Sequence, residues 1–221
     1  MKKFLPDLIA ILAFIVISFI YFFPAITEDR ILFQHDTVAG AGAGQEAKEY
    51  YERTGERTRW TNALFGGMPT YQMAPSYDST KSLSWVEKTY QLYLPEYVVL
   101  TFIMMLGFYI LLRAFGISAW LAGFGGIIWA FSSYFFILIP AGHIWKFVTL
   151  AYIPPTIAGI VLAYRRKYLL GGIITALFIA LQIRSNHIQM SYYFMFVILF
   201  IIGAYFEEAY KKKELTHFFK A

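Results

Sequence analysis

The sequence predicts an all-α fold: a polytopic bundle of six transmembrane helices with a helical extracytoplasmic loop after the first span. Three observations lead to this prediction. Of the 221 residues, 58% are hydrophobic and only 15% are charged, against roughly 25% charged residues in an average soluble domain. The hydrophobic residues lie in long runs without charges. The positive charges between these runs fall almost entirely on one side of the predicted bundle.

Composition also excludes several classes of protein. A soluble domain of this length would have to bury more apolar surface than one core holds. A disordered chain would be polar and poor in aromatic residues, whereas 20% of this chain is aromatic. The chain has no cysteine, which excludes disulfides, a zinc finger and a thiolate nucleophile.

Gaps between charged residues define the spans. The uncharged stretches hold 20 residues after Asp7, 16 after Glu96, 32 after Arg113, 18 after Lys146, and 16 and 22 on either side of Arg184. A helix that crosses the hydrocarbon core needs about 20 apolar residues, and long flanking side chains extend a shorter one. The predicted spans are Leu8–Ile26, Tyr97–Leu112, Leu121–Ile139, Phe147–Tyr164, Tyr168–Ile183 and Met190–Phe206.

The positive charges assign a side to each loop. With the N-terminus in the cytoplasm, only Lys146 and Arg184 lie in the short outer loops. The inner side holds Lys2, Lys3, Arg113, Arg165, Arg166, Lys167, Lys211, Lys212, Lys213 and Lys220. This distribution follows the positive-inside rule. The net charge of +5 is therefore a signal of membrane topology, and we expect membrane lipids but no nucleic acid among the partners.

Four regions follow from this topology. Residues 1–26 form the cytoplasmic N-terminus and first span, and residues 27–96 form an extracytoplasmic domain with short helices near Gln45–Arg53 and Leu83–Tyr93. Residues 97–206 form a five-span bundle. Residues 207–221 form a charged cytoplasmic tail, which has the character of a linker into more protein, so we expect the chain to be the front part of a longer one.

Asp36 is the most prominent polar residue of the outer domain. Two interpretations are open. Aspartate is a preferred helix cap, so Asp36 would accept hydrogen bonds from the first N–H groups of the following helix. Alternatively, a carboxylate just outside the membrane would act as the general base that removes a proton from an acceptor hydroxyl.

Two later outer turns carry further polar side chains. His143 and Lys146 lie three residues apart, which places them on one face of a helical turn. The other turn holds Arg184, Asn186, His187 and Gln189. Polar residues at a membrane boundary commonly cap helices or contact headgroups. Their concentration on one side favours an outward site for an anionic headgroup, in which arginine and lysine bind a phosphate.

A divalent cation such as Mg or Mn is a further option. Asp36 is the candidate ligand, together with His35, His143 or His187. The spacings match no known metal motif, so the sequence leaves the metal unassigned.

The order of the motifs resembles the GT-C superfamily of glycosyltransferases, and within it the N-terminal part of the bacterial YfhO-type membrane proteins. The residues that carry the resemblance are Gln34-His35-Asp36, Gln45, the stretch Trp60-x-Asn62-x-x-Phe-Gly-Gly-x-Pro69, Gly142-His143-x-x-Lys146 and Asn186-His187-x-Gln189. In that superfamily an early outer aspartate is the catalytic base or a metal ligand, a role that falls on Asp36. Many members have a second acidic residue in a later outer loop, and this chain has none there.

The resemblance implies transfer of a sugar from a polyprenyl-phosphate donor to a cell-envelope acceptor at the outer face of the membrane. Asp36 is then the expected catalytic residue. The expected substrate-binding residues are His35, Gln45, Trp60, Asn62, His143, Lys146, Arg184, Asn186, His187 and Gln189. Two alternatives stay open: a transporter or flippase for a lipid-linked anion, and a non-catalytic membrane assembly protein.

Overall fold

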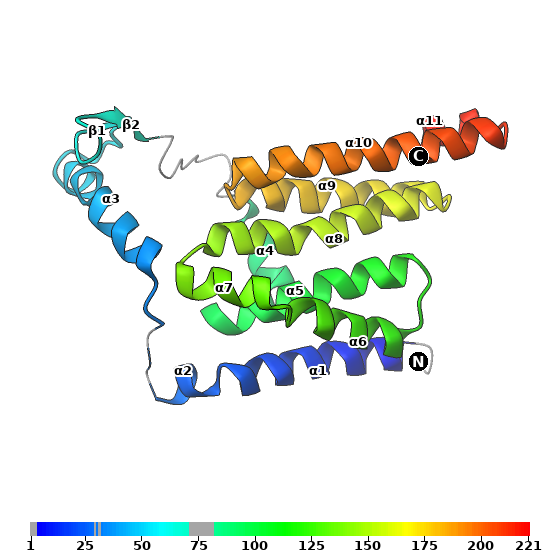
Figure 1. Cartoon of the computed structure of the whole chain (residues 1–221), viewed down its shortest axis with the longest axis horizontal. Coiled ribbons are helices and arrows are strands. Elements are labelled where there is room, and N and C mark those ends of the chain that lie inside the picture. Colours follow the sequence, from blue (N-terminus) through cyan, green and yellow to red (C-terminus); the bar gives the residue numbers. More distant parts are fainter. Residues whose placement is uncertain (1–3, 29, 31, 71–81) are drawn as a thin grey trace.

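The computed structural model describes residues 4–28, 30, 32–70 and 82–221. Its described residues form an almost entirely helical molecule in which a bundle of long helices carries a smaller arm at one end (Figure 1). The helices that run along the bundle are α1 (Leu5–Tyr21), α5 (Glu96–Ala114), α6 (Ala119–Ala130), α7 (Ser133–Ala141), α8 (Ile144–Tyr164), α9 (Tyr168–Arg184) and α10 (Ile188–Lys211). The all-α fold predicted from the sequence is confirmed.

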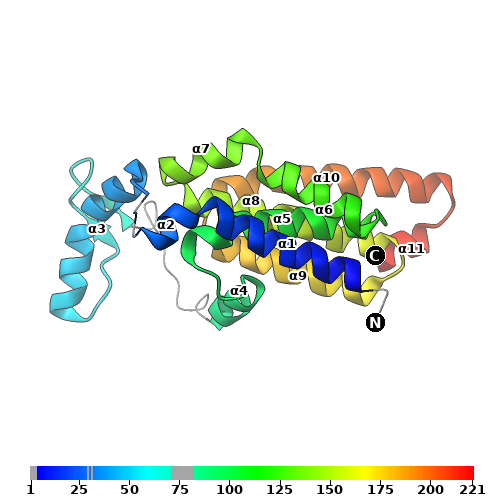
Figure 2. The ribbon, with the colours of Figure 1, turned by 90° about the horizontal axis from the view of Figure 1, so that it is seen from below.

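The arm comes from the segment after α1. Helix α2 (Phe23–Thr27) ends the first pass, and α3 (His35–Thr54) then projects from the bundle in both ribbon views (Figures 1 and 2). A two-stranded antiparallel ribbon, β1 (Trp60–Thr61) and β2 (Met68–Pro69), packs against α3. The short helix α4 (Ser84–Tyr90) returns the chain to the bundle.

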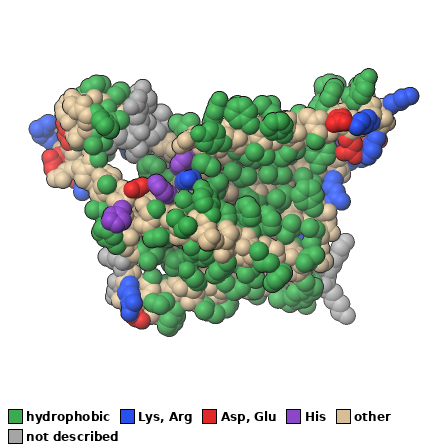
Figure 3. Space-filling view, in the orientation of Figure 1, with side chains coloured by type: hydrophobic (Ala, Val, Ile, Leu, Met, Phe, Trp, Pro, Cys, Tyr) green, Lys and Arg blue, Asp and Glu red, His purple; other side chains and the backbone are tan. Residues whose placement is uncertain are grey.

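The centre of the bundle is formed by α5 and α8. Most side chains of α5 are buried, and Phe102, Met104 and Tyr152 are fully enclosed in the main cluster of apolar residues. Helix α10 lies at the edge, where Tyr192, Phe200 and many other large apolar side chains are exposed. Exposed apolar side chains cover the side of the bundle in Figure 3, whereas charged side chains gather at its two ends.

This surface is typical of a membrane protein, and the helix lengths agree in part. Three helices, α5, α8 and α10, are long and apolar enough to cross a membrane. A fourth candidate span is the pair α6 and α7, which is bent by 46°. Helices α1 and α9 are apolar but only 17 residues long. The prediction of six spans therefore stays a prediction.

The third predicted span, Leu121–Ile139, is broken. Helix α6 ends at Ala130 and α7 starts at Ser133, with Ser132 in an extended conformation between them. Pairs of serine or glycine residues are common at sharp bends in helices. Pro154 and Pro155 lie within α8, which continues through both.

Helices α8 and α9 are in close contact because glycines face each other. A methyl group on Gly159 would lie 2.5 Å from the backbone N of Thr175 and 2.8 Å from the carbonyl O of Gly171. These neighbours are backbone atoms, which cannot rotate away as a side chain can. Gly159 therefore permits the close approach of the two backbones, as small residues do at helix interfaces in membranes.

Replacing Gly159 by Ala is expected to destabilise the protein by about 1–3 kcal/mol, the usual cost of overpacking. The matched control is Gly172→Ala in α9, since nothing lies within 4 Å of a methyl group at Gly172. Thermal unfolding of both variants in the same detergent measures the difference. Equal melting temperatures for the two variants would show that a methyl group at Gly159 fits between α8 and α9 without destabilising the protein.

Candidate functional site

The first turn of α3 is fixed against the turn between α7 and α8. The buried side chain of Gln34 donates from Nε2 to the carbonyl O of Ile139 at 2.8 Å, and its Oε1 accepts from Thr37 Oγ1 at 2.9 Å. Gly142 adopts a left-handed conformation with φ of +86°, and a methyl group there would lie 2.9 Å from the backbone N of Thr37. The contact requires glycine at this position, and it holds the start of α3 beside the turn.

This contact places Asp36 next to His143. Nδ1 of His143 lies 3.2 Å from Oδ2 of Asp36. Asp36 is in the first turn of α3, whereas Gln34 occupies the N-cap position and no side chain caps the helix. The interpretation of Asp36 as the helix cap is therefore wrong. Both side chains of the pair are about half exposed, at 57% and 47%, so a molecule at the surface can reach them.

Lys146 and His187 complete the cluster. The ammonium group of Lys146, on the first turn of α8, lies 5.5 Å from the ring centre of Tyr134. His187 precedes α10, and its Nδ1 accepts a hydrogen bond from the backbone N of Met190 at 3.3 Å. Partial burial lowers the pKa of His187, and repulsion from Lys146 and His143 lowers it further. His187 is therefore neutral at pH 7, with Nε2–H as its remaining donor.

The outer cluster, as we call Asp36, His143, Lys146 and His187, joins three segments that are far apart in the sequence. Histidine, basic and acidic side chains lie side by side at the arm end of the apolar surface (Figure 3). Among the described residues, no carboxylate forms an ion pair with Lys146. The cluster thus combines a base, a neutral imidazole and a cation that is free to meet an anion.

Arg184 has a different position from the one predicted. Its Nη1 lies 3.1 Å from Oε2 of Glu87 on α4, and both side chains are largely buried. Oε1 of Glu87 also accepts from the hydroxyl of Tyr152 at 3.0 Å. The charge of Arg184 is therefore neutralised within the protein, so Lys146 is the better candidate for a phosphate. The sequence did not indicate Glu87, which is one of several polar residues on a short helix.

The other predicted residues lie in local contacts. The His35 ring packs edge-on against Phe33, and Gln45 donates to Glu49 on the exposed side of α3. Gln189 donates to the hydroxyl of Tyr193 one turn along α10. Asn186 forms the turn before α10 with a positive φ of 65°.

Trp60 and Asn62 belong to the ribbon, whose partner on α3 is Glu46. Glu46 lies ten residues after Asp36, or about 15 Å further along the helix axis. The structure therefore separates the ribbon from the outer cluster.

The residues at the outer cluster do not fit the proposed divalent cation. Within the parts of the chain that the structure describes, no group of three or more His, Asp or Glu residues is placed to hold a metal ion. Asp36 and His143 supply two ligands, and the neighbouring Lys146 repels a cation. We therefore assign no metal to Asp36.

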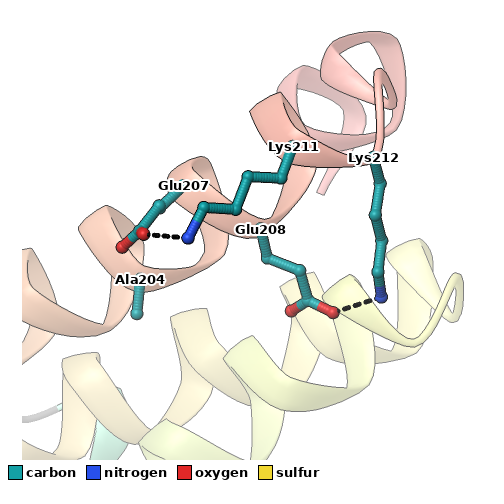
Figure 4. A pocket seen from close by; sticks show the side chains of 5 residues that line it. All are labelled: Ala204, Glu207, Glu208, Lys211 and Lys212. Carbon is teal, nitrogen blue, oxygen red and sulfur yellow. Dashed lines mark hydrogen bonds and ion pairs between the residues drawn. The ribbon is translucent and has the colours of Figure 1, made fainter.

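Two cavities lie at the opposite end of the bundle. One of about 340 Å³ is lined by Ala204, Glu207, Glu208, Lys211 and Lys212 (Figure 4). Its lysines are paired with its glutamates one helical turn away, at 2.5 Å in each case. The other, of about 260 Å³, lies between α11 (Leu215–Lys220) and the turn after α8. Because the opposite charges in the first cavity satisfy each other, we assign it no ligand.

Comparison with protein-family models, with curated proteins and with solved structures finds no match to this chain. The resemblance to YfhO-type proteins therefore rests on the sequence motifs alone.

Proposed function

We propose that the protein is a membrane glycosyltransferase that moves a sugar from a polyprenyl-phosphate donor to a cell-envelope acceptor on the outer face of a bacterial cytoplasmic membrane. The observation that carries the proposal is the contact of 3.2 Å between Asp36 and His143 at one end of an apolar helix bundle. Asp36 is the base of the reaction. In the proposal His143, whose Nδ1 lies within ion-pair distance of the carboxylate, orients Asp36 for this role.

The transfer step uses Asp36 directly. The acceptor hydroxyl loses its proton to the Asp36 carboxylate while its oxygen forms a bond to the anomeric carbon of the donor. The bond between that carbon and the phosphate oxygen breaks, and its electron pair stays on the phosphate. Attack and departure take place on opposite faces, so the configuration of the sugar inverts.

Lys146 and His187 act on the leaving phosphate. Negative charge on the phosphate grows as the bond breaks, and a nearby ammonium group stabilises it most strongly in a site shielded from water. Neutral His187 offers Nε2–H as a hydrogen-bond donor to a phosphate oxygen. The closeness of His187 to Lys146 is supported by the electrostatic effect of Lys146 on the pKa of His187.

The membrane supplies the donor in this proposal. A polyprenyl tail would lie along the exposed apolar faces of the helices, with its phosphate at the level of the outer cluster. Six spans, with both termini in the cytoplasm, place this cluster outside and the basic turns inside. The start of α1 and the end of α11 lie at the same end of the bundle in Figures 1 and 2, which supports an even number of passes.

The test is a transfer assay with the full-length protein in membrane vesicles. A polyprenyl-phosphate sugar with a radiolabelled sugar is added, and loss of label from the lipid is followed together with its appearance in an acceptor fraction. Turnover that requires the protein supports the transferase. Movement of intact donor across the bilayer without turnover would assign a flippase instead. If the assay detects neither turnover nor movement of the donor, the protein is a non-catalytic assembly protein.

A further inference from the structure

The ribbon on the arm presents a tryptophan in an unusual setting. The strands pair Trp60 with Pro69 and Thr61 with Met68. The turn between them includes Phe65, Gly66 and Gly67, all with positive φ. This short element has no core of its own, so something outside it must hold it in place.

Glu46 of α3 holds the ribbon. Its carboxylate accepts hydrogen bonds from Thr61 Oγ1 at 2.6 Å, from the backbone N of Asn62 at 2.7 Å and of Ala63 at 3.1 Å, and from Asn62 Nδ2 at 3.0 Å. The bond from Thr61, followed by those from Asn62, lowers the pKa of Glu46. Thr61 is almost completely buried. The ribbon is therefore fixed to the helix by a dense set of polar contacts.

The indole of Trp60 is held on one side and open on the other. A methyl group on Gly67 would lie 2.7 Å from Cζ2 of the indole, so Gly67 lies directly against the ring. Indole Nε1 donates to Asn62 Oδ1 at 3.2 Å. The Trp60 side chain is nevertheless 52% exposed, and Phe65 at the turn is 92% exposed. A large aromatic ring is thus fixed in orientation without being covered.

We infer that this fixed ring binds the saccharide part of the acceptor, an inference that rests on the proposed function. The C–H face of a sugar ring packs on an aromatic ring, and its hydroxyls bond to polar groups at the ring edge. Asn62 provides such a group at the edge of the Trp60 ring, because its amide nitrogen has two N–H donors and only one is needed for the bond to Glu46. A ring that is already immobilised loses little entropy when a ligand binds, which is the advantage of preorganisation.

The position of the ribbon agrees with this role. Glu46 lies about 15 Å from Asp36 along the axis of α3, and the same helix carries both residues. An acceptor of a few sugar units reaches from Trp60 towards the base. The polar residues that hold the ribbon favour a saccharide over a lipid surface, which would require a continuous apolar patch.

The experiment measures saccharide binding by the full chain in lipid nanodiscs without donor lipid. The probes are cellotetraose, maltotetraose and chitotetraose. Binding of each probe is measured by saturation-transfer NMR. At least one should bind to the wild type, and Trp60→Ala should weaken that binding at least tenfold. Trp60→Phe, which keeps a ring over Gly67, should bind with intermediate affinity. The matched control is Trp85→Ala, which removes another exposed tryptophan, on α4.

Three results would overturn the inference. The first is the absence of binding by the wild type to all three probes, and the second is equal binding by the Trp60→Ala and Trp85→Ala variants. The third is quenching of Trp60 fluorescence by brominated lipids, measured as the difference between the wild type and Trp60→Phe, which would make the ribbon a membrane anchor. Because the binding experiment contains no donor lipid, its result does not depend on whether the protein transfers sugar.

Discussion

Replacing Asp36 by Asn is expected to lower the rate of sugar transfer by about 10²–10⁴-fold, the usual contribution of a positioned general base. Asparagine has the same shape, and its side-chain oxygen can occupy the place of the Asp36 oxygen that lies 3.2 Å from His143 Nδ1. The variant lacks only the carboxylate that takes the proton. The KM for the donor should change little, because in the proposed mechanism Asp36 contacts the acceptor and not the phosphate.

The same substitution should leave the fold intact. Both members of the pair with His143 are about half exposed, and exposed pairs contribute at most about 1 kcal/mol to stability. Glu52→Gln is the matched control, since it removes an exposed carboxylate from the same helix. Rates are compared in vesicles at equal protein content. A rate for Asp36→Asn equal to that of Glu52→Gln would remove Asp36 from the mechanism.

Replacing Glu87 by Ala is expected to destabilise the protein by about 3–5 kcal/mol, the cost of leaving one charge of a buried pair without its partner. The side chains of Glu87 and Arg184 are only 14% and 24% exposed. The substitution also removes the acceptor for the hydroxyl of Tyr152, which is fully buried. Helix α4 thereby loses the polar contacts that Glu87 makes with α8 and α9.

A second variant separates the charge effect from the loss of packing. Glu87→Ala combined with Arg184→Met should recover part of the lost stability, because no unpaired charge is then left behind. Glu207→Ala breaks an exposed ion pair on α10 and should cost about 0.5 kcal/mol or less. Denaturant unfolding in a single detergent measures all three. If Glu87→Ala costs no more than Glu207→Ala, the pair does not hold α4.

The sequence predicted the positions of the helices well where charges mark both ends. The span Phe147–Tyr164 was predicted between Lys146 and Arg165, and α8 ends at Tyr164. The break between α6 and α7 was missed because Ser132 and Ser133 lie within an apolar run that has no charge to interrupt it. The length of an uncharged run indicates that a helix can cross the membrane there, but it does not show whether that helix is straight.

Helix α3 was also longer than predicted. The prediction placed a helix at Gln45–Arg53, because glycine costs about 1 kcal/mol in a helix and Gly40, Gly42 and Gly44 precede it. The structure continues the helix back to His35. Contacts at two points compensate for the glycines: Gln34 bonds to Ile139 before the helix starts, and Glu46 bonds to the ribbon. Such long-range contacts cannot be deduced from local propensity.

Part of the candidate site was predictable. The topology placed Asp36, His143 and His187 on the same side, and the structure places them in one cluster with Lys146. The ion pair of Arg184 could not be predicted from the sequence, because its partner Glu87 lies nearly a hundred residues earlier in the chain. A residue type and its side of the membrane indicate available chemistry, but only the packing of α4 shows which charges are already paired.

The central claim is that the outer cluster, built from three separate segments, faces the outside of the cell. The absence of cysteine from the chain permits a direct measurement with single cysteines and a membrane-impermeant maleimide in intact cells. Thr54→Cys on α3 and Gln189→Cys on α10 should react from outside, whereas Ser118→Cys and Thr216→Cys at the opposite end should react only after permeabilisation. Labelling of Ser118→Cys in intact cells, or protection of Gln189→Cys, would contradict the six-pass topology and with it an outward-facing site.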